Sequence, residues 1–82
     1  MKITVKLLGG FSQYLPKNAK ADTIEVALEN GSSVLDLLNK VGIPKDQPKN
    51  ILINGRPFGE PPDEKLLNDN DVVAMFPFVA GG

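Results

Sequence analysis

The chain has 82 residues, of which 41% are hydrophobic and 23% charged, so it can form one small core and is too short for a second domain. It contains no cysteine and no histidine, which excludes disulfides, thiol nucleophiles and histidine-based catalytic or metal sites. Nine basic and ten acidic side chains leave a net charge of −1, without the basic excess that nucleic-acid binding uses. We therefore expect no nucleic-acid partner, no metal site and no bound cofactor.

The first part of the chain predicts two strands. Apolar and polar side chains alternate over residues 2–7 and again over residues 23–29, which is typical of strands with one buried face. The inward-facing residues are Ile3, Val5, Leu7, Ile24, Val26 and Leu28. Gly9-Gly10 ends the first strand, and one helical turn is expected over residues 11–15 before the second, antiparallel strand.

A helix is predicted over residues 34–41, where apolar side chains recur at the spacing of one broad helix face. Ser33 is placed to cap this helix, and Asp36 three residues later completes a capping box. Gly42 and Pro44 are typical of a helix end. A helix of about two turns is unstable alone in water, so we expect it to pack on a sheet.

The second part of the chain predicts three more strands. A β-branched run over residues 50–53 is followed by Asn54-Gly55, which favours a tight hairpin turn, and a short return strand at 56–58. Leu66-Leu67 is expected to form an apolar plug, and a final strand covers residues 72–76. The simplest packing is an α+β roll, a single domain over residues 1–82 with a mixed sheet of four to five strands on one helix.

The sequence ends with Gly81-Gly82, and residues 77–82 are expected to form a flexible tail. Two residues without Cβ give a narrow backbone that can enter a tight enzyme channel and present a terminal carboxylate. At about 3.3 Å per residue, the segment from Phe76 to Gly82 would reach ~20 Å beyond the sheet. A carboxylate is a poor electrophile until it is activated, so the activating chemistry must belong to another protein.

The sequence resembles the ubiquitin-like, β-grasp sulfur carriers of the MoaD/ThiS superfamily. The resemblance covers essentially the whole chain and rests on four segments: residues 31–34, 53–55, 67–72 and 76–82. The ending Phe76-Pro77-Phe78-Val79-Ala80-Gly81-Gly82 is most similar to that of the small subunit of molybdopterin synthase. Met75 and Phe78 depart from the residues common in that subunit.

This resemblance implies a sulfur carrier rather than an enzyme. An E1-like enzyme would use ATP to adenylate the carboxylate of Gly82, and a sulfur donor would convert the adenylate to a thiocarboxylate. The tail would then enter the large subunit of molybdopterin synthase, where its sulfur builds the dithiolene that binds molybdenum or tungsten. Alternatives are a carrier for thiamine or another thiolation pathway, a ubiquitin-like protein modifier, and an interaction module with an inert tail.

Strand alternation also predicts a docking surface. If the inward residues face the helix, four apolar side chains remain on the opposite face of the sheet, where polar residues are the rule: Leu8, Leu52, Ala74 and Phe76. Together with Pro77, Phe78, Val79 and Ala80 of the tail, they are expected to contact the activating enzyme and the acceptor subunit.

No apolar stretch is long enough to span a membrane, and the N-terminus turns polar too early for a signal peptide. We therefore expect a cytoplasmic protein with no membrane partner. It is expected to be a monomer alone and a heteromer with its partner.

Overall fold

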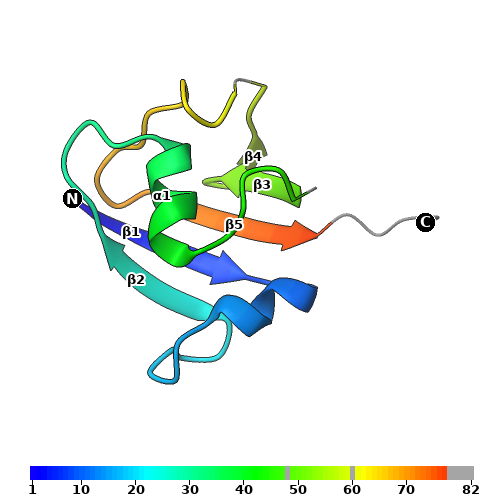
Figure 1. Ribbon diagram of the computed structural model, residues 1–82. Coiled ribbons are helices and arrows are strands. Elements are labelled where there is room, and N and C mark those ends of the chain that lie inside the picture. The colour runs from blue at the N-terminus through cyan, green and yellow to red at the C-terminus, as the bar shows by residue number, and fades with distance from the viewer. Residues whose placement is uncertain (48, 60, 78–82) are drawn as a thin grey trace.

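The computed structural model describes residues 1–47, 49–59 and 61–77. Five strands form one mixed sheet in the order β2-β1-β5-β3-β4, and α1 lies across one face of it (Figure 1). The elements are β1 (Lys2–Leu7), the 3-10 helix η1 (Gly9–Tyr14), β2 (Thr23–Ala27), α1 (Val34–Val41), β3 (Lys49–Ile53), β4 (Arg56–Pro57) and β5 (Val72–Pro77). The predicted α+β roll, a mixed sheet packed on one helix, is confirmed.

The parallel pair of β1 and β5 lies at the centre of the sheet. Val5 lies opposite Val73, and Leu7 lies opposite Met75. β2 pairs with β1 in the antiparallel direction that the sequence predicts. β3 pairs antiparallel with β5 on the other side. The first and last strands of the chain therefore lie side by side, as the blue and orange arrows show (Figure 1).

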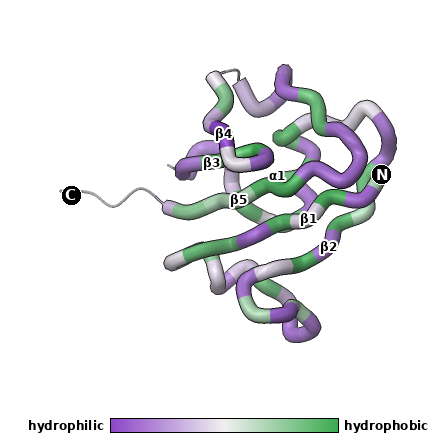
Figure 2. Tube along the Cα trace, turned by 180° about the vertical axis from the view of Figure 1, so that it is seen from behind, coloured by the Kyte–Doolittle hydropathy of each residue, from purple (hydrophilic) through white to green (hydrophobic). Residues whose placement is uncertain are grey.

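The core lies between α1 and the sheet face that α1 covers. Its buried residues are Ile3, Val5, Leu7, Phe11, Val26, Val34, Leu37, Leu38, Ile43, Leu67, Val73 and Met75. Hydrophilic and hydrophobic residues alternate along β1, whereas β5 is hydrophobic as far as its end, where Pro77 follows (Figure 2). Burying each large aliphatic side chain stabilises the fold by roughly 1.5–3 kcal/mol. The residues of β2 and β3 that face the core are less well covered, because only Val26 is buried while Ile24, Ile51 and Ile53 are half-buried.

α1 begins and ends where its sequence signals place it. The Ser33 Oγ accepts a hydrogen bond from the Asp36 backbone N–H at 3.2 Å. In return, Asp36 Oδ2 accepts one from the Ser33 N–H at 2.8 Å. At the other end, Gly42 adopts the left-handed conformation (φ 96°) and its N–H donates to the Leu38 carbonyl at 2.8 Å. The predicted capping box and glycine stop are both confirmed.

The turn between β3 and β4 is fixed by a side-chain network as well as by its own backbone. Asn54 and Gly55 both have positive φ, 52° and 84°, as the predicted hairpin turn requires. The Asn54 Nδ2 donates to Asp71 Oδ1 at 2.9 Å, and its Oδ1 accepts from the Val72 N–H at 2.9 Å. Asp71 Oδ2 also accepts from the Asn68 N–H at 2.8 Å. Asp71 therefore ties the hairpin to the beginning of β5.

The segment after β1 and the return strand differ slightly from the expected elements. The helical turn is a 3-10 helix that begins at Gly9, two residues earlier than predicted. Its Phe11 ring is buried and meets the Tyr14 ring edge-on at 5.7 Å. β4 ends at Pro57 instead of Phe58. Proline lacks the N–H that a longer ladder would need.

The expectation of a buried Leu66-Leu67 plug is wrong for Leu66. Leu67 is buried, but Leu66 is 58% exposed. The backbone on both sides of Leu66 bonds to the beginning of α1 and to the residues before it, because the Val34 N–H donates to the Lys65 carbonyl and the Leu67 N–H to the Ser32 carbonyl. This pairing holds the backbone around Leu66 in an extended conformation, in which neighbouring side chains point in opposite directions. Leu67 therefore points into the core and Leu66 points to solvent.

We predict that Asp71→Ala lowers the free energy of unfolding by about 2 kcal/mol, because the Asn54 Nδ2 and the Asn68 N–H both lose their acceptor. Urea unfolding followed by circular dichroism measures the loss. Asp69→Ala is the matched control, since Asp69 is exposed and accepts one bond, from the Lys2 N–H. Equal losses in the two variants would contradict a structural role for the Asp71 network.

Candidate docking face and tail exit

The strand register brings the predicted docking residues together on the sheet face away from α1, called the open face below. Leu52 lies opposite Ala74 across β3 and β5. Ala74 and Phe76 flank Met75, which is fully buried toward α1, so their side chains point to the open face. Leu8 continues the extended backbone past β1 (φ −106°, ψ 159°) and reaches the same face. The four residues Leu8, Leu52, Ala74 and Phe76 are called the apolar patch.

All four residues of the apolar patch are half-buried. Val72 extends it along β5, since it lies opposite Thr4 and is also half-buried. The sequence reasoning missed Val72, although the alternation that identified Ala74 and Phe76 includes it. Thr4 and Lys6 of β1 border the patch with polar side chains. An apolar centre with a polar rim is typical of a surface that binds another protein.

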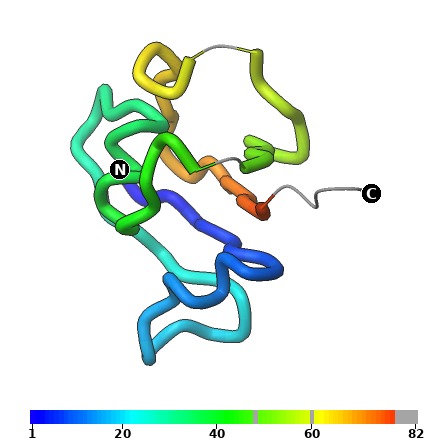
Figure 3. Tube along the Cα trace, turned by 45° about the vertical axis from the view of Figure 1, so that its right-hand side comes forward, coloured from blue at the N-terminus to red at the C-terminus, as the bar shows by residue number. Residues whose placement is uncertain are grey.

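Pro77, at the end of β5, lies beside η1. A Cβ built on Gly9 would lie 3.5 Å from Pro77 Cδ, and one on Gly10 would lie 3.8 Å from Pro77 Cγ. The Leu8 N–H donates to the Met75 carbonyl at 2.9 Å just before this contact. The end of β5 therefore lies between η1 and the first residues of β3 (Figure 3).

Lys49 is the charged residue that the structure places at this exit. It lies opposite Pro77 in the β3–β5 pair. Its Nζ donates to the Lys45 carbonyl at 3.1 Å. Partial burial lowers the pKa of Lys49, and the charge of Asp46 opposes this by raising it. The sequence alone gave Lys49 no role, because its position beside Pro77 depends on pairing between segments far apart in the chain.

The remaining predicted site residues lie outside the described part of the chain. These are Phe78, Val79, Ala80, Gly81 and Gly82. The structure therefore describes the apolar patch and β5, the strand that precedes these residues.

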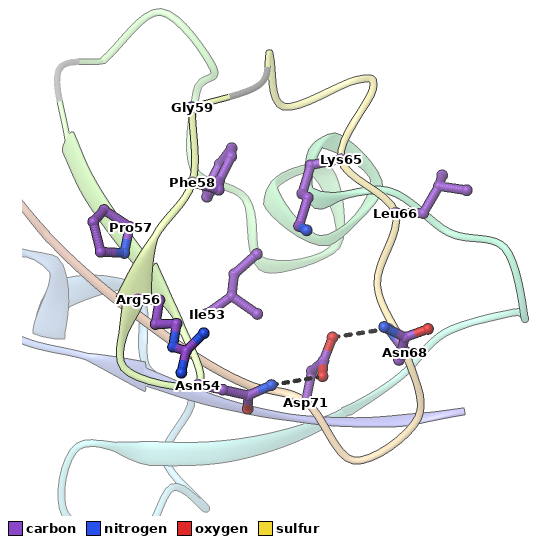
Figure 4. Close-up of a pocket in the computed structure, with 10 residues that line it drawn as sticks. All are labelled: Ile53, Asn54, Arg56, Pro57, Phe58, Gly59, Lys65, Leu66, Asn68 and Asp71. Carbon is purple, nitrogen blue, oxygen red and sulfur yellow. Dashed lines mark hydrogen bonds between the residues drawn. The ribbon is translucent and has the colours of Figure 1, made fainter.

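A separate cavity of about 610 Å³ lies at the opposite end of β5 (Figure 4). The Asn54–Asp71–Asn68 hydrogen bonds line one side of it, and Phe58 and Lys65 line the other. Its residues come from the β3–β4 turn and from the segment before β5, whereas the tail leaves from the far end of that strand. The cavity therefore does not coincide with the apolar patch or with the end of β5, where the tail begins.

Within residues 1–47, 49–59 and 61–77, no three acidic side chains are grouped so that they could hold a metal ion. In the same part of the chain, no helix has the length and apolar character needed to cross a bilayer.

The sequence pattern of the ThiS family matches residues 13–82, which is most of the chain and includes the glycine pair. The chain belongs to the ThiS family. The predicted membership of the ubiquitin-like MoaD/ThiS sulfur carriers is therefore confirmed. No curated protein sequence matches the chain.

Solved structures support the same assignment. A Pyrococcus furiosus protein, provisionally described as molybdopterin converting factor, subunit 1, is 29% identical, with a TM-score of 0.71 over 95% of this chain and 98% of its own. SAMP1 from Haloferax volcanii, a small archaeal modifier protein, is 21% identical, with a TM-score of 0.69 over 100% of both chains. A complex of subunits 1 and 2 of molybdopterin-converting factor from Helicobacter pylori 26695 contains an 18% identical match, with a TM-score of 0.56 over 100% of both chains. The predicted β-grasp fold is confirmed by these matches.

We predict that Leu52→Asp leaves cooperative unfolding in place, because Leu52 lies half-buried on the open face. Ile51→Asp should lower the free energy of unfolding by about 3 kcal/mol, because its side chain packs against the core and a carboxylate there has no partner. Thermal unfolding by circular dichroism compares the two variants. A larger loss for Leu52→Asp than for Ile51→Asp would show that the faces are assigned the wrong way round.

Proposed function

We propose that this protein is a sulfur carrier whose reactive group is the carboxylate of Gly82. The observation that supports this most strongly is the ThiS family match, which extends through Gly81 and Gly82. In this proposal the protein is a substrate of other enzymes and performs no catalysis of its own. It binds no cofactor, and ATP is consumed by its activating enzyme.

The carrier chemistry takes two balanced steps. An E1-like enzyme joins the Gly82 carboxylate to the AMP of ATP and releases pyrophosphate. Hydrosulfide supplied by a sulfur donor then attacks the acyl carbon, the bond between that carbon and AMP breaks, and a thiocarboxylate forms at Gly82. The sequence has no cysteine of its own that could hold the sulfur.

We assign the sulfur to molybdopterin synthesis, and the thiamine and other thiolation pathways are the alternatives. The support is the match to the Pyrococcus furiosus protein described as molybdopterin converting factor, subunit 1, which covers nearly all of both chains. In this role the tail of residues 77–82 enters a large acceptor subunit and gives its sulfur to a pterin precursor. The Helicobacter pylori match is itself a complex of subunit 1 with subunit 2.

The apolar patch is proposed to dock both the activating enzyme and the acceptor subunit. The patch follows the second half of β5, and its residue Phe76 is followed by Pro77, the last residue of that strand. A partner that covers Leu52 and Phe76 therefore receives the tail at a fixed position. We propose that the free protein is a cytoplasmic monomer that forms a heteromer when it docks.

We predict that the purified protein supports pyrophosphate release from ATP when it is mixed with the E1-like enzyme of its own organism. Deletion of Gly82 should abolish the release, because the carboxylate is then displaced by one residue from the ATP phosphate.

Leu52→Asp should raise the KM for the carrier at least tenfold with a smaller effect on kcat, because it weakens docking. Pyrophosphate is measured by a coupled assay.

Thr23→Ala is the matched control, because Thr23 lies on the open face at the β2 edge, away from the patch. Undiminished pyrophosphate release by the Gly82 deletion would contradict the proposal. The appearance of higher-mass protein conjugates in place of a thiocarboxylate would favour the modifier alternative.

A further inference from the structure

The outer edge of β2 is an open strand edge among the described residues. β2 is the terminal strand in the sheet order, and β1 is its one strand partner. At its start, Thr23 and Lys20 exchange two backbone hydrogen bonds of 3.0 and 3.1 Å, so this end is closed. Pro16 of the η1–β2 connection lies beside Ile24 and Glu25, but among the described residues no backbone hydrogen bond to the outer edge is made at Glu25 or Ala27.

The register shows which backbone groups face outward. Leu28 N–H donates to the Met1 carbonyl, and Leu7 N–H donates to the Asp22 carbonyl. In an antiparallel pair, every second residue of a strand bonds to the partner strand through its backbone. Because Asp22 and Leu28 are bonded positions, the backbone groups of Ile24 and Val26 also bond to β1. Glu25 and Ala27 alternate with them along β2 and direct their N–H and C=O groups away from β1. These four groups are arranged to accept one further strand.

A groove of about 280 Å³ follows this edge between β2 and the second half of α1. Ile24 and Val26 form its sheet side, and Val41 contributes from α1. Tyr14 lies at the η1 side of the groove, where its hydroxyl donates to Gln47 Oε1 at 3.0 Å. The groove therefore offers apolar contacts directly beside the open backbone groups.

Lys40 is the one charged residue that α1 contributes to the lining of the groove. Glu25 also borders it, but this residue alternates with Ile24 and Val26, so its carboxylate lies on the open face, 3.3 Å from Lys2 Nζ. Lys40 is exposed at the last turn of α1 and borders the groove. Among the described residues, no carboxylate forms an ion pair with Lys40.

We propose that the β2 edge and the groove beside it bind an extended, acidic segment of a partner protein as an added strand. Its backbone would bond to Glu25 and Ala27. Its alternate apolar side chains would contact Ile24, Val26 and Val41, and an acidic side chain would pair with Lys40. This surface lies at the opposite edge of the sheet from β3 and β4 (Figure 1), so a carrier docked through its apolar patch can bind the segment at the same time.

A second copy of this chain fits the edge less well than a separate acidic segment. The side chains of β2 on the α1 side, Ile24 and Val26, already pack against their own core. A copy would also bring a second Lys40 to the same groove, where like charges repel.

The test uses the full-length protein and a capped synthetic peptide in which valine and serine alternate between pairs of aspartates. The NMR amide signals of Glu25 and Ala27 should shift on titration, and their hydrogen exchange should slow about tenfold or more, because both N–H groups gain acceptors. N-methylation of the central peptide residues should weaken binding about tenfold by removing backbone donors. Signal changes confined to Leu52 and Ala74, or none at millimolar peptide, would overturn the proposal.

Two protein variants test the same contacts. Lys40→Glu should weaken peptide binding about fivefold, whereas Lys45→Glu should change it less than about twofold. Lys45 is exposed and lies beside Pro61 and Pro62, in a different surface depression. Equal effects of the two variants would overturn the assigned charge contact. Concentration-dependent dimerisation with shifts at Glu25 and Ala27 would overturn the partner assignment in favour of a second copy.

Discussion

The parallel hydrogen bonding between β1 and β5 is the constraint on which the rest of the structure depends. The Thr4 N–H donates to the Asp71 carbonyl at one end of this pair, and the Leu8 N–H donates to the Met75 carbonyl at the other. A slip of one residue would exchange the two faces of β5, burying Phe76 and exposing Met75. The register of this pair therefore determines both the core and the surface on the open face.

Contacts at each end of β5 oppose such a slip. At its beginning, Asp71 is held by Asn54 and by the backbone of Asn68. At its end, Pro77 packs against Gly9 and Gly10. β5 is therefore held at both ends, and the position of Pro77 at its end is set with it. A carrier that presents its terminus to several enzymes needs this constancy, because each active site must receive the same carboxylate in the same place.

The sequence predicted those features that depend on local chemistry. Ser33 with Asp36, and Asn54 with Gly55, specify their cap and turn within a few residues, and alternation separated Leu52, Ala74 and Phe76 from the core. It did not predict the features that depend on distant segments. Lys49 beside Pro77 is a product of strand pairing, and Leu66 is exposed because its neighbours bond to the segment before α1. Such pairings follow from the whole fold and have no local sequence signal.

The central claim is that sulfur is bound at Gly82, and intact mass spectrometry of the protein purified from its own cells tests it most directly. The account predicts a species heavier by the difference between one sulfur and one oxygen atom, localised by fragmentation to the terminal glycine. A protein found as the free acid alone, even after incubation with ATP, a sulfur donor and its E1-like enzyme, would contradict the account.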